Sequence, residues 1–264
     1  MLTKELTDSI HINFQTEEDM KQFDELYDFY GEYFIRRLCE SISFHSNSNT
    51  INYNDFFELY EYNRRLWKII TNYVVIWEES LIANFAKNYN FKKGASKRNF
   101  HQNQVKRGEM YVENIELTKN GIKSNFYDYF DESFGVFRAI CCNPVIRSEY
   151  HYPGFEYLDH IRNIDKLNKY RNNIIHSVFI IIDKNNPKKI LNEVVMNKVK
   201  IIYQYLPSFH KQSLLKELNE IIPKNKEGIV YKKFIIDLSR LDFDIENDNM
   251  KIRNPLYSKA LLTN

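Results

Sequence analysis

Apolar residues recur every three or four positions along two long stretches of this chain, and this spacing constrains the fold more than any other feature. The stretches cover about residues 16–43 and 54–91. Such spacing keeps side chains on one face of an α-helix, so each stretch predicts a helix with one buried stripe. Thr16 precedes three acidic residues and is the expected N-cap of the first helix. The second stretch is either one helix or two helices broken near Asn63.

The remaining chain also favours helices, so we expect a mainly all-α fold in a single domain over residues 1–264. Only 7 Gly and 6 Pro occur in 264 residues, which disfavours sandwiches and barrels with many turns. A hydrophobic fraction of 43% is enough for a core. Helical patterns continue over about residues 126–142, 154–183, 190–205 and 207–222. Residues 110–125 predict a short strand or an irregular insertion, and residues 229–238 a strand or a short helix.

Composition excludes several classes of protein. A net charge of +2 is too small for a polycation that coats nucleic acid indiscriminately. Cys39, Cys141 and Cys142 have no CxxC spacing, so neither a zinc site nor a disulfide framework is supported, and a reducing compartment fits best. No apolar run reaches the roughly 18 residues that cross a bilayer, and the first residues lack a signal-peptide pattern. We therefore expect a cytoplasmic protein without a membrane segment, metal or cofactor.

One segment, about residues 91–108, concentrates positive charge without a nearby acid until Glu109. Phe100 and His101 lie among its cations, which are Lys92, Lys93, Lys97, Arg98, Lys106 and Arg107. Cations can follow a phosphate backbone while the aromatic rings stack on bases. The segment predicts an RNA-binding loop, with a solvated linker as the alternative.

A second polar cluster is expected near the end of the 154–183 helix. At 3.6 residues per turn, Asn172 and His176 lie one turn apart on one face, and Arg171 lies about 100° from Asn172. The guanidinium can hold a phosphodiester, and the imidazole can move protons near neutral pH. This combination suits phosphate chemistry. A similar pair, Arg162–Asn163, has Leu167 where the histidine would stand.

The pattern Arg171-Asn172-x-x-x-His176 resembles the signature of the HEPN superfamily, which comprises small helical domains with a ribonuclease site. The sequence from Lys169 to Asn172 also resembles the abortive-infection (Abi-like) branch, which acts in phage defence. The resemblance implies a HEPN-like helical bundle and a metal-independent endoribonuclease that acts as a toxin. It also implies a homodimer that pairs two motif helices across a two-fold axis, and an antitoxin partner made of RNA or protein.

In this interpretation each motif residue has a role. His176 is the general base or acid, Arg171 binds the phosphate, and Asn172 orients the histidine or the phosphate. Tyr170 is expected in the core rather than in catalysis. A cyclic phosphate product is expected because RNA supplies its own nucleophile, the 2'-hydroxyl.

Other interpretations stay open. Glu78 and Glu79 are expected to be exposed surface carboxylates, although HEPN folds often place an acidic or polar helper on a helix facing the motif. The whole chain can instead be a non-catalytic helical module that binds RNA or protein and carries a vestigial motif. A metal hydrolase is disfavoured, because the seven histidines are scattered and no HExxH pattern occurs.

Overall fold

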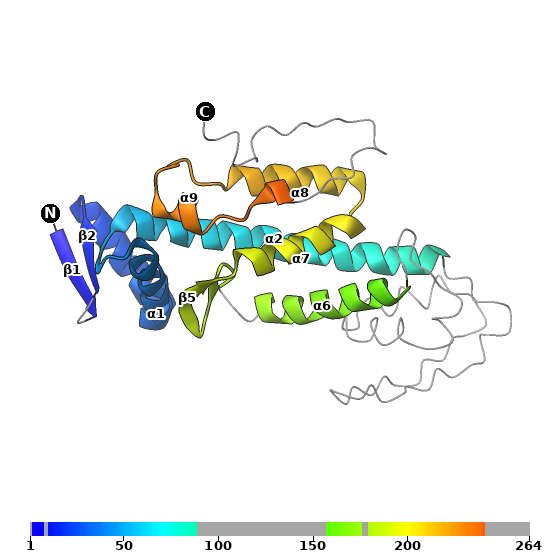
Figure 1. Ribbon diagram of the computed structural model, residues 1–264, viewed down its shortest axis with the longest axis horizontal. Coiled ribbons are helices and arrows are strands. Elements are labelled where there is room, and N and C mark those ends of the chain that lie inside the picture. The colour runs from blue at the N-terminus through cyan, green and yellow to red at the C-terminus, as the bar shows by residue number, and fades with distance from the viewer. Residues whose placement is uncertain (1, 8–9, 89–156, 176–178, 241–264) are drawn as a thin grey trace. The chain divides into compact units, whose positions relative to one another are not determined.

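The computed structural model describes residues 2–7, 10–88, 157–175 and 179–240 (Figure 1). These residues are mainly helical, which confirms the expected fold class. The α-helices are α1 (Glu17–Ser46), α2 (Tyr53–Asn88), α6 (Tyr157–Ile175), α7 (Asn192–Tyr205), α8 (Ser208–Glu220) and α9 (Ile229–Lys233). The strands are β1 (Leu2–Thr7), β2 (Ile10–Phe14), β3 (Thr50–Asn52), β4 (Ile182–Asp183) and β5 (Asn186–Ile190). A 3₁₀ turn covers Leu238–Arg240.

The chain divides into two compact units, and the division falls within α2. The first unit takes its described residues from Met1–Ile70, Ser177–Lys200 and Gln212–Asn264. The second takes them from Thr71–His176 and Ile201–Lys211. Each unit therefore combines segments that are far apart in the sequence.

A three-stranded sheet in the first unit was not predicted from the sequence. β2 pairs antiparallel with β1 and parallel with β3, and α1 packs against the sheet. The ring of Phe23 on α1 lies 5.6 Å from Phe14 on β2 and 5.1 Å from Phe56 on α2. Strands of three to six residues carry little periodic signal, so their pairing depends on this burial.

Helix α1 begins where the sequence predicts. The Thr16 hydroxyl accepts a hydrogen bond from the Asp19 backbone N–H at 3.1 Å, and the Asp19 carboxylate accepts one from the Thr16 N–H at 2.9 Å. This reciprocal pair is a capping box, which satisfies two N–H groups at the helix start. Gly31 interrupts the helix with φ 79° and ψ 162°, values that are essentially restricted to glycine.

Helix α2 is continuous, which confirms the one-helix alternative and not the break near Asn63. The Asn63 side chain is buried, and its Oδ1 accepts hydrogen bonds from the backbone N–H groups of Ile180 (3.0 Å) and Ile181 (3.3 Å). The carboxamide binds a distant segment instead of competing for the helix's own backbone, so the helix persists.

The helix in the 154–183 region is shorter than the amphipathic pattern of the sequence predicts. α6 is described to Ile175, and the chain is extended by Ile182, where a β4–β5 hairpin begins. The Asp183 carboxylate accepts hydrogen bonds from the N–H groups of Asn185 (2.9 Å) and Asn186 (3.3 Å), and this favours a turn over a helix. Phe179, Ile180, Ile181 and Ile182 are buried as a continuous apolar run. Such a run fits a buried extended segment as well as a helix.

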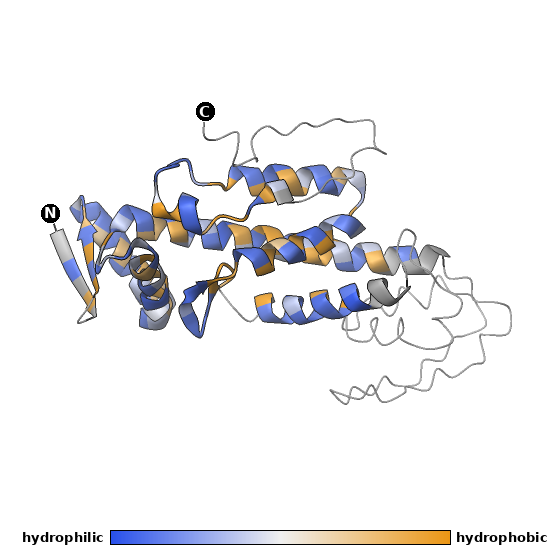
Figure 2. Ribbon diagram, in the orientation of Figure 1, coloured by the Kyte–Doolittle hydropathy of each residue, from blue (hydrophilic) through white to orange (hydrophobic). Residues whose placement is uncertain are grey.

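The helices after α6 lie close to the positions that the sequence predicts. α7 and α8 confirm the helices expected over 190–205 and 207–222, and α9 confirms the short-helix alternative for 229–238. Apolar residues follow much of α2 and α7 (Figure 2). Within the described ranges, no helix is long and apolar enough to cross a membrane. The predictions for residues 91–108, 110–125 and 126–142 lie outside the described residues.

Candidate active site

Arg171 occupies a position on the buried stripe of α6. In the second unit, the apolar side chains of Ile164, Leu167 and Ile174 are each less than 5% exposed. Arg171 lies four residues after Leu167 and three before Ile174, so it falls within the same stripe. Its side chain is 30% exposed, so it is not fully buried like its apolar neighbours on the stripe. Helix α6 therefore places the positive charge of Arg171 on the same face as its buried apolar residues.

Glu78 occupies the matching position on α2. It follows the buried Trp77 and lies between the buried Val74 and Leu81 at helical spacing. Its Oε1 forms an ion pair with the Arg171 Nε, so α6 and α2 contribute one charge each. The side chain is only 14% exposed, so the expectation of an exposed carboxylate is wrong for Glu78. Glu79 is exposed as expected.

The register of Glu78 was the signal available in the sequence. A carboxylate four residues after one buried apolar residue and three before another lies on the core stripe rather than on the outer face. The same argument applies to Arg171. Two opposite charges on two buried stripes are expected to meet, because an unpaired buried charge is costly.

Burial sets the electrostatics of Glu78. Desolvation raises the pKa of its carboxyl above the ordinary value, because the charged form loses water. The Arg171 guanidinium opposes this shift, and the neighbouring Glu79 adds to it. The net direction is upward, so the ion pair compensates only part of the desolvation.

Asn172 lies beside Arg171 and is exposed. Its amide oxygen accepts a long hydrogen bond from the Arg171 Nη1 at 3.4 Å. A guanidinium has five N–H donors, and the contacts with Glu78 and Asn172 use one nitrogen each. Neither contact uses Nη2, so among the described residues the guanidinium keeps unused N–H donors. Arg171 and Asn172, which are adjacent in the sequence, are thus also joined by a side-chain hydrogen bond.

Tyr170 belongs with the core, as expected. Its hydroxyl is buried, and burial raises the pKa of the phenol above its ordinary value. The side chain stays neutral at physiological pH, so it is unsuited to serve as a general base.

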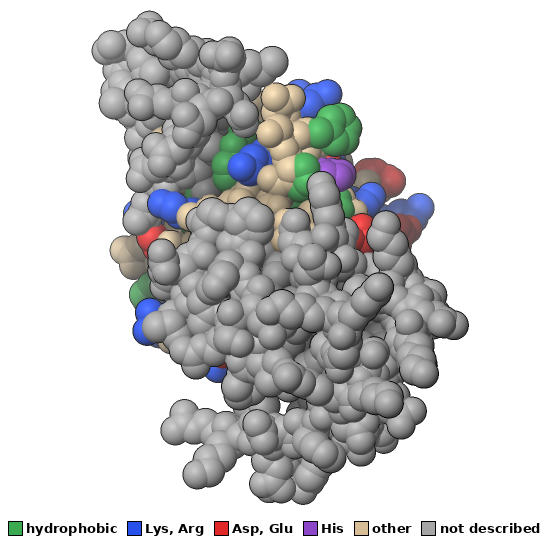
Figure 3. All heavy atoms as spheres, turned by 90° about the vertical axis from the view of Figure 1, so that its right-hand side faces the viewer, with side chains coloured by type: hydrophobic (Ala, Val, Ile, Leu, Met, Phe, Trp, Pro, Cys, Tyr) green, Lys and Arg blue, Asp and Glu red, His purple; other side chains and the backbone are tan. Residues whose placement is uncertain are grey.

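The other predicted site residues lie outside the described residues. These are His176 and the six cations of the 91–108 segment, Lys92, Lys93, Lys97, Arg98, Lys106 and Arg107. In the described ranges, no group of three or more His, Cys, Asp or Glu side chains is placed to hold a metal ion. Figure 3 shows both Lys or Arg and Asp or Glu side chains where the described surface is visible.

Comparison of the chain with protein-family models, with curated proteins and with solved structures gives no match.

Proposed function

We propose that this protein is a metal-independent endoribonuclease whose site is built from Arg171, Asn172 and His176. The observation that supports this proposal is the ion pair that holds the Arg171 Nε on Glu78 while the arginine side chain stays 30% exposed. A fixed, partly exposed guanidinium is well suited to bind a phosphodiester through two N–H groups. His176 follows directly after the last described residue of α6 and supplies an imidazole, the side chain most often used to transfer protons.

The reaction needs two proton transfers and no external nucleophile. A base removes the proton of the RNA 2'-hydroxyl, the 2'-oxygen bonds to phosphorus, and the bond from phosphorus to the 5'-oxygen breaks. An acid protonates that 5'-oxygen, so the products are a 2',3'-cyclic phosphate and a 5'-hydroxyl. His176 takes one proton-transfer role, and Arg171 stabilises the charge that develops on the phosphate oxygens.

One imidazole does not readily perform both transfers at once. We therefore include a homodimer in the proposal, in which two motif helices contribute Arg171 and His176 to one cleft. The resemblance to Abi-like proteins extends the proposal to an RNA-cleaving toxin of phage defence that an antitoxin restrains. The basic segment at 91–108 is proposed to bind the same RNA.

The Glu78–Arg171 ion pair also favours a second candidate. An arginine paired with a largely buried carboxylate is a common structural feature. Removing one partner of such a pair destabilises the core, even where neither residue has a catalytic role. In this alternative the chain is a non-catalytic helical module that binds RNA or protein.

The deciding experiment is cleavage of a labelled RNA of mixed sequence in the presence of EDTA. We expect the wild-type protein to cleave it and His176→Ala to be slower by about 10²–10⁴-fold, the usual effect of losing a general acid or base. Arg162→Ala is a control for a change elsewhere on α6, because Arg162 is an exposed arginine of the other Arg-Asn pair. It should cleave like the wild type.

Binding and folding are measured alongside cleavage. Each variant is checked by circular dichroism and thermal unfolding, so that lost activity is not lost structure. Equal cleavage by wild type and His176→Ala would rule out the proposed role of His176. If neither cleaves and both bind RNA with equal affinity, the binding module is the better description.

A further inference from the structure

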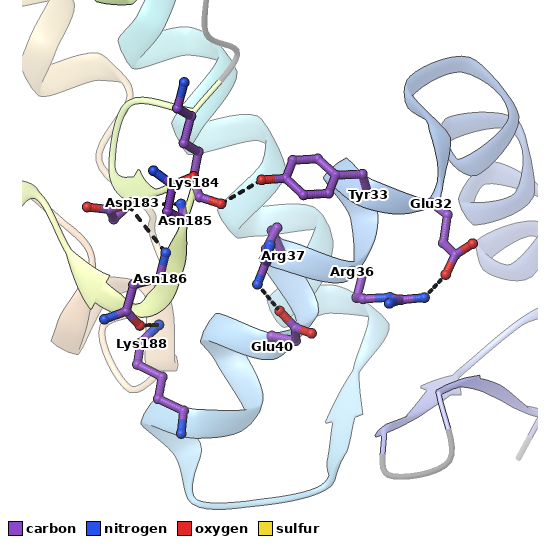
Figure 4. A network of polar contacts seen from close by, with 10 residues as sticks. All are labelled: Glu32, Tyr33, Arg36, Arg37, Glu40, Asp183, Lys184, Asn185, Asn186 and Lys188. Atoms are coloured by element: carbon purple, nitrogen blue, oxygen red, sulfur yellow. Dashed lines mark hydrogen bonds and ion pairs between the residues drawn. The ribbon is translucent and has the colours of Figure 1, made fainter.

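In the first unit, the β4–β5 hairpin is fixed against the C-terminal part of α1. The Tyr33 hydroxyl donates a hydrogen bond to the backbone carbonyl of Lys184 at 2.7 Å (Figure 4). The His45 Nε2 lies 3.1 Å from the backbone carbonyl of Lys188. Asp183 closes the turn between the strands. The backbone of the hairpin is therefore held at its turn and along its second strand.

Two exposed aromatic rings lie on this surface, and each has a cation over it. Tyr33 is 55% exposed, and the Arg37 guanidinium lies 5.2 Å from its ring centre. Phe44 is 51% exposed, and the Lys188 Nζ lies 5.1 Å from its ring centre. Large aromatic side chains usually bury more of their area, so two half-exposed rings are candidates for stacking with a ligand.

Cations exceed carboxylates on the same surface. Three of the cations have acidic partners: Arg36 pairs with Glu32, Arg37 with Glu40, and Lys189 with Asp183. Lys184 and Lys188 are exposed and have no carboxylate partner among the described residues. These two lysines leave an excess of two positive charges beside the rings.

We propose that this face, made by Tyr33, Phe44, Lys184 and Lys188 and called here the α1–hairpin surface, binds single-stranded RNA. Ammonium groups attract phosphates, and exposed rings stack on bases with little sequence preference. An acidic protein would use the lysines but would gain less from the rings. The choice of RNA rests on the proposed function, and the surface adds a substrate contact apart from Arg171 and His176.

The test measures binding without cleavage. The probe is a fluorescein-labelled 2'-O-methyl oligonucleotide of about ten nucleotides, a length within the range of known single-strand sites. It lacks the free 2'-hydroxyl, so binding does not depend on the reaction. Fluorescence anisotropy over a series of salt concentrations gives both affinity and salt slope.

The expected effects are specific to the surface. Lys184→Gln with Lys188→Gln should weaken binding and make the salt slope shallower by about 1.4, because two single-strand phosphate contacts are lost. Phe44→Ala should weaken binding about five-fold or more through lost stacking. Lys224→Gln with Lys226→Gln is the matched control, because it removes two exposed lysines elsewhere. The double change to arginine at 184 and 188 should retain affinity.

Three results would overturn the proposal. The first is an unchanged salt slope in the glutamine variant at 184 and 188. The second is a loss of affinity in the 224/226 control equal to that of the 184/188 variant. The third is a poly-glutamate peptide that competes with the oligonucleotide and binds with the same affinity. Failure of the proposed function is seen separately, as cleavage of ordinary RNA that survives His176→Ala. Failure of the proposed RNA-binding surface and failure of the proposed function can therefore be told apart.

Discussion

At the scale of single residues, the feature with most consequence is the ion pair between Glu78 and Arg171. Both charges lie on helix stripes that otherwise bury apolar side chains. The raised pKa of Glu78 shows that folding favours its protonated form relative to the unfolded chain. A carboxyl with a raised folded-state pKa stabilises the fold fully below its ordinary pKa. That stabilisation is lost as the pH rises through the raised value.

We therefore predict a pH-dependent difference between the wild type and Glu78→Gln. As the pH rises from below the ordinary pKa of glutamate to neutrality, the free energy of unfolding of the wild type should fall relative to that of the variant. Urea denaturation at a series of pH values measures this difference. Glu79→Gln is the control, since Glu79 is exposed, and should show a much smaller dependence. A difference that grows in the wild type's favour as pH rises would mean that attraction to Arg171 outweighs desolvation.

At the scale of elements, the interruption of α1 at Gly31 is a feature of the backbone alone. A Cβ placed on Gly31 would meet nothing within 4 Å, so space does not restrict this position. The restriction comes from φ 79° with ψ 162°, which lies outside the regions that other residues adopt. Glycine here lets one long amphipathic sequence change direction without a loop.

Gly31→Ala should destabilise the protein by about 1–3 kcal/mol, the usual cost of that backbone conformation with a side chain. Urea denaturation measures the change. Glu25→Ala, at an exposed position of the same helix, controls for alanine's helix propensity and should be nearly neutral. A stabilised Gly31→Ala would show that α1 straightens into one continuous helix, contrary to the conformation described here.

At the scale of the whole molecule, hydrogen bonds between distant segments decide which parts of the chain meet. Asn63 joins α2 to Ile180 and Ile181 across more than a hundred residues of sequence, with both partners buried in the first unit. Tyr62, the preceding residue, accepts a hydrogen bond from the Ile236 N–H at 2.9 Å through its hydroxyl. One turn of α2 therefore holds two later segments of the first unit.

Asn63→Ala should destabilise the fold by about 2–4 kcal/mol, because two buried N–H groups lose their acceptor. Denaturation gives the size of the effect, and hydrogen exchange should show faster exchange at the amides of Ile180 and Ile181. Asn72→Ala changes an exposed asparagine on the same helix and should have little effect. Unchanged exchange at both amides in Asn63→Ala would contradict the assigned hydrogen bonds.

The site was predicted only in part from the sequence, for reasons that differ by residue. Arg171 and Asn172 lie together because neighbours on a helix must, and helical periodicity is a local property. Glu78 was misplaced because its partner is 93 positions away in the sequence, and a pattern within one helix does not identify its partner on another. The region near Asn63 left one helix or two as alternatives for the same reason, since the hydrogen bonds of Asn63 are to a distant segment.

The mainly helical fold, the start of α1 at its Thr16 cap and the positions of α7 and α8 follow from local sequence patterns, because caps and apolar stripes act within a few residues. Three features become visible only in the folded chain: the sheet of β1, β2 and β3, the end of the amphipathic segment in a hairpin, and the pairing of Glu78 with Arg171. These features depend on burial and on contacts between segments far apart in the sequence. A pattern within one segment does not show which distant residues its side chains will contact.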